Sequence, residues 1–189
     1  CTGDTINWLV NDLQLLKSAT ETEELARSVE GNNGVYLVPA FVGLGAPYWD
    51  NQARAAITGM SRNTGKAHIA RAALESIAYQ VKDLIDLMGS EAGIKLKELR
   101  VDGGPTRNNF LMQFQADMLG NSIVRTSIEE VSALGSTFMA GLATGFWSSI
   151  EEISDLRLLD KTFEADMDAG QVEELYSGWL TAVKRAQLT

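Results

Sequence analysis

The chain has 189 residues, of which 45% are hydrophobic and 22% charged, a composition typical of one soluble globular domain with a sizeable core. Its formal net charge of −9 repels phosphate backbones and argues against a nucleic-acid partner. No run approaches the roughly 18 consecutive apolar residues of a membrane-spanning helix, and the N-terminus, Cys1–Asp4, lacks the features of a secretory signal. We therefore expect no membrane partner. Because one cysteine cannot form an internal disulfide, we also expect a reducing, cytoplasmic setting.

The first third of the chain predicts a helix followed by two short strands. Apolar residues fall on one helical face at Ile6, Leu9, Val10, Leu13 and Leu16. Residues 35–38 then have the pattern of a buried strand, and residues 55–58 that of a second one. Between them, residues 43–47 form a loop, because two glycines and a proline interrupt either regular structure.

The clearest predicted helix follows, with a cap at Thr64 and an end at Gly89 and Ser90. Its apolar residues recur at intervals of three and four, at Ile69, Ala73, Ile77, Val81, Leu84 and Met88.

Strands alternate with helices after residue 98. Residues 99–101 and 122–125 are strand candidates, and residues 109–119 form a helix that Gly120 ends. Residues 131–145 form a helix rich in small residues, which permit close packing against a neighbour. A last helix carries apolar residues on one face, at Val172, Leu175, Tyr176, Trp179, Leu180 and Val183. The pattern predicts one α/β domain over residues 1–189, with a mostly helix-covered sheet.

The junction at Gly103-Gly104 is the best candidate for a ligand site. Two adjacent glycines let the backbone turn sharply and approach a ligand, and the helix that follows offers unpaired N–H groups. Asn108 lies in its first turn, where its amide could bind a purine or a ribose. From the spacing alone, a tight turn with Asn108 or Asn109 as a cap is favoured over a nucleotide site, since short glycine motifs recur by chance.

Other chemically capable residues are interpreted as structural. His68, the one histidine, is interpreted as a surface or capping residue, because a metal site or catalytic triad needs partners that are missing. Cys1 has no neighbouring histidine that would make it a nucleophile. Asp50 and Asp102 are interpreted as turn residues. Three tryptophans are interpreted as core or interface residues: Trp49, Trp147 and Trp179.

Two longer segments resemble a known family. Residues 55–60 and residues 68–75, which seven residues separate, together resemble the second signature of the FGGY carbohydrate kinases. The stretch 38–50 resembles the glycerol-kinase branch of that family, as do residues 99–104 and 108–117. The likeness spans nearly the whole chain and is weakest in the acidic C-terminal stretch.

The resemblance implies the actin/hexokinase-type (ribonuclease H-like) α/β fold, in which two domains enclose an active-site cleft. This chain would be most of the second, nucleotide-side domain, and we expect it to be a fragment that lacks the N-terminal domain and the first part of this one. By position, Gly103, Gly104 and Asn108 match the family's adenosine motif. Gly3 and Asn7 match a second nucleotide-contacting pair, although Asp4 and Asn7 depart from the usual motif.

The implied activity is transfer of the γ-phosphate of ATP, with Mg²⁺, to a primary hydroxyl of glycerol or a related polyol. The family's general base, polyol-binding residues and phosphate loops match nothing in this sequence, so we name no catalytic residue or metal ligand here and expect this chain alone to be inactive. The alternatives are a sibling sugar kinase, of the xylulose or gluconate type, and a non-catalytic nucleotide-binding module. Family members often form homo-oligomers, and no feature of this sequence places such an interface.

Overall fold

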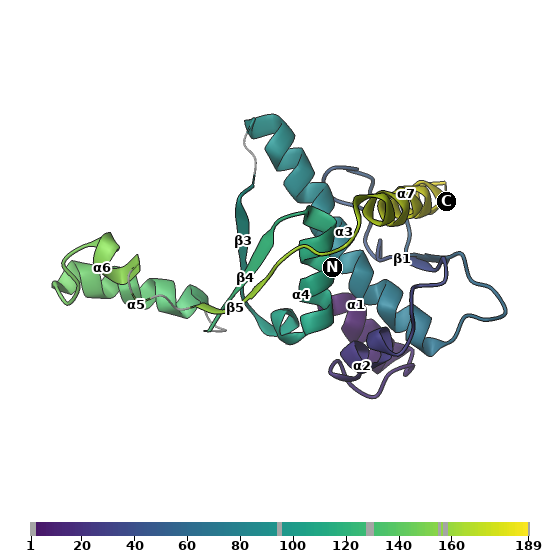
Figure 1. The fold of residues 1–189 in the computed structure, drawn as a ribbon, viewed down its shortest axis with the longest axis horizontal. Helices are drawn as coiled ribbons and strands as arrows, with labels where there is room; N and C mark the ends of the chain where they lie inside the picture. Colours follow the sequence, from purple (N-terminus) through teal and green to yellow (C-terminus); the bar gives the residue numbers. More distant parts are fainter. Residues whose placement is uncertain (1–2, 94–95, 128–130, 155, 157–158, 189) are drawn as a thin grey trace.

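The computed structural model describes residues 3–93, 96–127, 131–154, 156 and 159–188, so that Cys1 lies outside the described part. Helices α1, α2, α3, α4 and α7 and all the strands form one body, and α5 with α6 extends away from it as an arm (Figure 1). None of the described helices combines the length and the apolar character that crossing a bilayer requires.

The first helix is shorter than its apolar spacing predicts. Helix α1 (Gly3–Asn7) passes into a π-helical turn, η1 (Trp8–Asp12), in which Leu13 N–H donates to Trp8 O over 3.0 Å. A π turn holds more residues than an α turn and therefore shifts the later side chains around the axis. As a result Leu13 is 49% exposed, whereas Leu16 is buried from the irregular segment that leads to α2 (Glu21–Arg27). The prediction of one helical face through residue 16 was wrong.

Strands β1 (Tyr36–Val38) and β2 (Ala56–Thr58) confirm the two predicted strands and pair antiparallel, with Leu37 opposite Ile57. The connection between them is the predicted loop, and Asp50 Oδ1 accepts the N–H groups of Gln52 and Ala53 at 2.9 and 3.1 Å. The interpretation of Asp50 as a turn residue is therefore confirmed. Trp49 on the same loop is 78% exposed, so it is no part of the core.

Gly59, which ends β2, is a position at which only glycine fits. Its φ is +79°, and an added Cβ would overlap the carbonyl oxygen of Gly34. We expect Gly59→Ala to lower the free energy of unfolding in urea by about 2 kcal/mol or more, because both backbone segments must shift. Gly31→Ala is the control, since its Cβ would meet only Asn33 N at 4.0 Å. Equal unfolding midpoints for the two variants would contradict this packing.

Helix α3 (Lys66–Ala92) is the spine of the body and confirms the longest predicted helix, with different ends. Gly65 is its N-cap in place of Thr64, and His68 Nδ1 accepts the Gly65 N–H at 3.1 Å, which confirms the capping role of His68. The helix continues past the predicted end to a left-handed Gly93. Its last turns project beyond the body (Figure 1), so Leu84 and Met88 are 42% and 63% exposed and do not continue the buried stripe.

The main sheet has the order β3-β4-β5, with β3 (Glu98–Val101) parallel to β4 (Ser122–Thr126) and β5 (Leu159–Phe163) antiparallel to it. Helix α4 (Asn109–Leu119), ended by a left-handed Gly120 as predicted, packs on one face and against α3. The alternate positions on the sheet, such as Glu98 and Arg100, are exposed. Among the described residues, helices therefore cover one face of the sheet.

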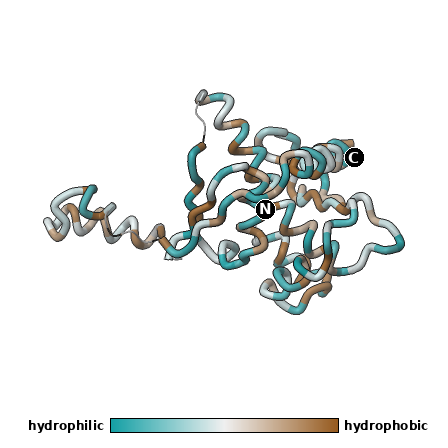
Figure 2. Tube along the Cα trace, in the orientation of Figure 1, coloured by the Kyte–Doolittle hydropathy of each residue, from teal (hydrophilic) through white to brown (hydrophobic). Residues whose placement is uncertain are grey.

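The arm consists of α5 (Val131–Thr144) and α6 (Ile150–Ser154). Trp147 folds back on α5, edge-on to Phe138 at 5.2 Å, and lies where a Cβ on Gly141 would be. The small residue Gly141 therefore leaves room for one aromatic ring. Apolar residues recur along the arm (Figure 2), and three of them are strongly exposed: Met139 at 68%, Phe146 at 76% and Ile150 at 67%.

Helix α7 (Ala169–Ala186) closes the core, with Trp179 fully buried and stacked on Tyr79 of α3 at 5.3 Å. Buried Asp83 of α3 fastens this helix in place. Its carboxylate accepts hydrogen bonds from the hydroxyls of Tyr176 (2.6 Å) and Tyr48 (3.0 Å) and from Trp179 Nε1 (2.9 Å). Three donors converge on one carboxylate, which joins the loop before β2 and α7 to α3.

Candidate functional site

The predicted glycine turn lies between β3 and α4. Exposed Asp102 follows β3, Gly103 has φ 88° and ψ 170°, and a short 3-10 turn, η2 (Gly104–Arg107), leads to Asn108. The backbone of Gly103 lies in a region that only glycine occupies readily. Gly104 has ordinary φ, and a Cβ added to it would meet no atom within 4 Å. Gly103 is therefore required by the turn itself, and Gly104 is not.

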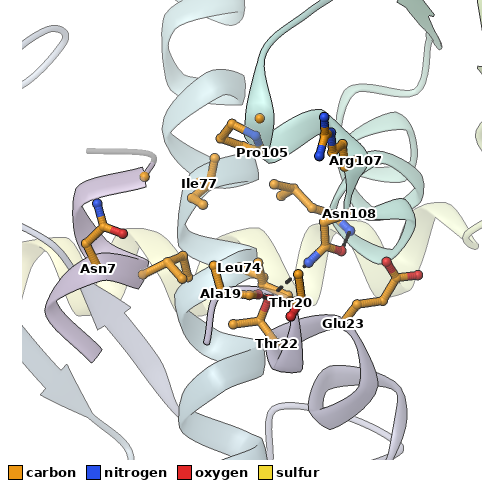
Figure 3. A pocket seen from close by; sticks show the side chains of 14 residues that line it. Asn7, Ala19, Thr20, Thr22, Glu23, Leu74, Ile77, Pro105, Arg107 and Asn108 are labelled. Atoms are coloured by element: carbon orange, nitrogen blue, oxygen red, sulfur yellow. Dashed lines mark hydrogen bonds between the residues drawn. The ribbon is translucent and has the colours of Figure 1, made fainter. Parts of the chain in front are cut away.

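The space beside Gly104 belongs to a cavity of about 420 Å³ between α1, α2, α3 and the η2–α4 turn (Figure 3). Four of the five residues predicted to bind a nucleotide line it: Gly3, Asn7, Gly104 and Asn108. Gly103 does not line this cavity. It borders a separate polar cavity of about 350 Å³, together with Arg125 and Asp160.

The surface that lines this cavity is mostly apolar, although polar and apolar side chains both contribute to it. The apolar side chains come from Ile6, Ala19, Leu74, Ile77, Pro105 and Leu111, and the polar ones from Asn7, Thr20, Thr22, Glu23, Arg107 and Asn108. A small number of polar groups around an apolar slot is the usual arrangement of a site for a flat organic ring.

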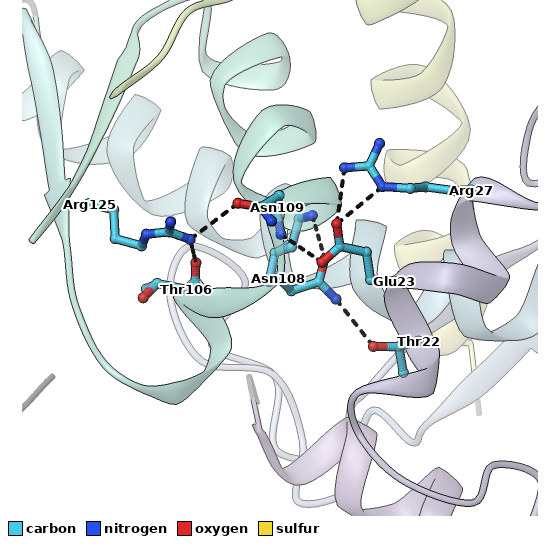
Figure 4. A network of polar contacts seen from close by, with 8 residues as sticks. Thr22, Glu23, Arg27, Thr106, Asn108, Asn109 and Arg125 are labelled. Carbon is cyan, nitrogen blue, oxygen red and sulfur yellow. Dashed lines mark hydrogen bonds and ion pairs between the residues drawn. The ribbon is translucent and has the colours of Figure 1, made fainter. Parts of the chain in front are cut away.

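Asn108 serves both as a cap and as a wall of the cavity. Its Oδ1 accepts the Leu111 N–H at 3.0 Å, and its Nδ2 donates to Thr22 Oγ1 at 3.2 Å (Figure 4). The capping interpretation of Asn108 is confirmed, and it is compatible with a ligand-binding role because the same side chain borders the cavity.

Glu23 fastens α2 to the start of α4 beside this bond. Its carboxylate accepts the Asn109 N–H at 3.0 Å and pairs with Arg27 at 3.1 Å (Figure 4). Thr22 and Glu23 were not predicted as site residues. They lie 86 positions before their partners in the chain, and no local motif joins the two segments.

Arg71 and Glu75, both in the signature segment, connect α3 to the chain near α2 and so support the cavity. Glu75 is 1% exposed, pairs with Arg71 at 2.7 Å and accepts from Asn32 Nδ2 at 2.8 Å. Burial raises the pKa of the Glu75 carboxyl, and its partners oppose that shift. Arg71 also donates to Val29 O at 2.7 Å, so this pair ties the chain just after α2 to α3 and fixes one wall of the cavity.

On the other side of the turn, Arg125 of β4 holds η2 to the sheet. Its guanidinium donates to Thr106 O (3.0 Å) and Asn109 Oδ1 (3.2 Å), as Figure 4 shows. It also pairs with Asp160 at 2.6 Å. With the Thr106 hydroxyl donating to Gly103 O at 2.7 Å, the turn is held on both sides. These contacts within the protein hold the cavity wall in place.

Known proteins match the chain along almost its whole length. The model of the FGGY family of carbohydrate kinases, C-terminal domain, matches residues 1–144. A glycerol kinase of Pseudomonas fluorescens is 51% identical over 185 residues, and glycerol kinases of a Shewanella species and of Thermococcus gammatolerans are each 54% identical. Each match covers 98% of this chain and 37% of the relative, so the chain spans little more than a third of the length of these relatives.

Solved structures agree with this assignment. A Plasmodium falciparum glycerol kinase with ADP superimposes with a TM-score of 0.90 at 38% identity, over 98% of this chain and 37% of that one. A xylulose kinase of Lactobacillus acidophilus, at 23% identity, superimposes with a TM-score of 0.77 over 95% of this chain and 37% of that one, and shows the shared fold. The predicted actin/hexokinase-type α/β fold is confirmed. The chain belongs to the FGGY family of carbohydrate kinases and corresponds to its C-terminal domain.

Proposed function

We propose that this chain supplies the adenosine-binding side of an ATP-dependent glycerol kinase. The observation that carries the proposal is the apolar cavity that Gly3, Asn7, Gly104 and Asn108 line together. Support for glycerol as the acceptor comes from relatives named glycerol kinase at 51 to 54% identity. In the full enzyme the γ-phosphate of ATP would pass to a primary hydroxyl of glycerol.

The cavity suits the adenosine part of the nucleotide rather than its phosphates. The N-terminal amides of α4 at Asn109 and Leu111 already donate to the Glu23 carboxylate and to Asn108 Oδ1. Those groups are what a helix N-terminus ordinarily offers to a phosphate. We therefore place adenine and ribose between the apolar walls, with the open space beside Gly104 next to them.

The phosphoryl-transfer chemistry requires groups that we do not assign to this chain. In the described ranges, no three Asp, Glu, His or Cys side chains come close enough together to hold a metal ion, so no ligand for Mg²⁺ is named here. Kinases depend on positioning and on charge stabilisation of the transferring phosphoryl group, and one wall of a nucleotide site supplies little of either. We propose that the chain alone does not phosphorylate glycerol.

We also propose that the arm packs against a part of an FGGY kinase that this sequence does not contain. Helix α5 carries no charged residue over 14 positions, and Met139 of α5 is strongly exposed, as is Phe146 just after it. An isolated helix of this length is marginally stable in water unless a neighbour buries its apolar face. This packing would cover the apolar side chains of the arm.

A chimeric enzyme tests the proposed function. This chain would replace the matching 185-residue segment of the Pseudomonas fluorescens glycerol kinase, and ADP formation would be measured with glycerol, xylulose and gluconate in turn. We expect glycerol-dependent ADP formation within about tenfold of the parent enzyme, because a cavity like the one described would be restored. A folded chimera that forms no ADP with glycerol would contradict the proposal.

A further inference from the structure

The amide of Asn108 has only one orientation that satisfies its neighbours. Thr22 Oγ1 donates its single proton to Ala19 O at 2.6 Å, so toward Asn108 it can only accept. On the other side, Leu111 N–H can only donate, and it faces Asn108 Oδ1 at 3.0 Å. The oxygen and the nitrogen of this amide, which often cannot be told apart, are therefore assigned by two independent contacts.

Thr22 makes this contact from inside the protein. It is 1% exposed, whereas Asn108 is half-buried, and both residues line the cavity (Figure 3). After the two contacts are counted, the Asn108 amide keeps one N–H donor and one acceptor position. A ligand in the cavity thus meets a donor and an acceptor whose order cannot be reversed without breaking both contacts.

This remaining pair discriminates between purines. With its N7 edge toward Asn108, adenine offers the 6-amino donor beside the N7 acceptor, which is the complement of an amide. In the same orientation hypoxanthine presents its 6-oxo group and N7, which both accept, so the amide oxygen would have no donor to bind. A base that leaves a polar group of the site unpaired binds more weakly.

We propose that Thr22 is a positioning residue that fixes the amide of Asn108 and thereby makes the site select adenine. The inference rests on the proposed function, because it requires adenosine to occupy this cavity. Thr22 itself does not have to touch the nucleotide. Its contribution is the acceptor that holds Nδ2 in place.

The test compares ADP with IDP, whose bases differ in the 6-substituent and in the proton on N1, so that on the N7 edge only the 6-position changes. Calorimetric affinities would be measured for the wild-type chain, Thr22→Val and Thr22→Ser. Valine matches threonine in volume but cannot accept from Nδ2, whereas serine keeps the hydroxyl. Thr181→Val is the matched control, because exposed Thr181 also donates its hydroxyl to a backbone carbonyl and lies outside the cavity.

We expect the wild-type chain, Thr22→Ser and Thr181→Val to bind ADP about tenfold or more tightly than IDP. In Thr22→Val the ratio should fall below about threefold, chiefly through weaker ADP binding. Because the ratio cancels any loss of folded protein, a stability defect alone cannot produce this result. An unchanged ratio in Thr22→Val with intact ADP binding would overturn the role of Thr22 only. A folded wild-type chain that binds no ADP would overturn the proposed function, and this inference with it.

Discussion

Gly104→Val should lower the affinity for ADP by about a hundredfold, or about 2.7 kcal/mol, without a measurable loss of stability. The space that a Cβ would enter at Gly104 holds no protein atom within 4 Å, and the backbone there has an ordinary φ. A side chain at this position would therefore leave the fold intact and occupy room that we assign to adenosine. Titration calorimetry for affinity and urea unfolding for stability would measure the two effects separately.

Two other glycines make this result interpretable. Gly45→Val is the control for introducing a valine, since a Cβ at Gly45 also meets open space and Gly45 does not line the cavity. Gly103→Ala should instead lower the free energy of unfolding, because the φ of 88° at this position strains any other residue by about 1–3 kcal/mol. If Gly104→Val bound ADP as tightly as Gly45→Val, the nucleotide would have to lie elsewhere.

Asp83→Ala should lower the free energy of unfolding by about 3–5 kcal/mol, the largest stability effect that we expect from one substitution in this chain. The change leaves the hydroxyls of Tyr48 and Tyr176 and the indole N–H of Trp179 without their shared acceptor. Each buried donor that loses its partner costs about 1–3 kcal/mol. Urea unfolding followed by circular dichroism would measure the loss.

Asp86→Ala provides the matched control on the same helix. Asp86 is 53% exposed in its side chain and pairs with Lys82, so its loss should change stability by less than about 0.5 kcal/mol. Similar unfolding midpoints for the Asp83 and Asp86 variants would mean that Asp83 does not hold α7 to α3.

Local sequence chemistry predicts the turn at Gly103-Gly104 well. A strand candidate, two glycines and a cap residue are contiguous in sequence, and the structure has β3, η2 and the Asn108 cap in that order. Spacing could not indicate that Gly103 serves the turn while Gly104 faces the cavity. That distinction depends on one backbone angle and on the position of side chains from α1 and α2.

The parts that the sequence does not predict are those that distant segments determine. Thr22 reaches Asn108 across 86 positions, and neither residue carries a pattern that names the other. Leu13 is exposed because the chain adopts a π turn, a choice that apolar spacing does not reveal. Leu84 and Met88 continue the helical period of α3, yet no element of the described chain reaches far enough to bury them.

The most direct test of the adenosine-binding role is calorimetric titration of the folded wild-type chain with ADP, followed by competition with adenosine or with orthophosphate. We predict binding at one site that adenosine displaces and orthophosphate does not, because the cavity faces the base and the ribose. A folded chain that shows no ADP binding, or ADP that only orthophosphate displaces, would contradict the account.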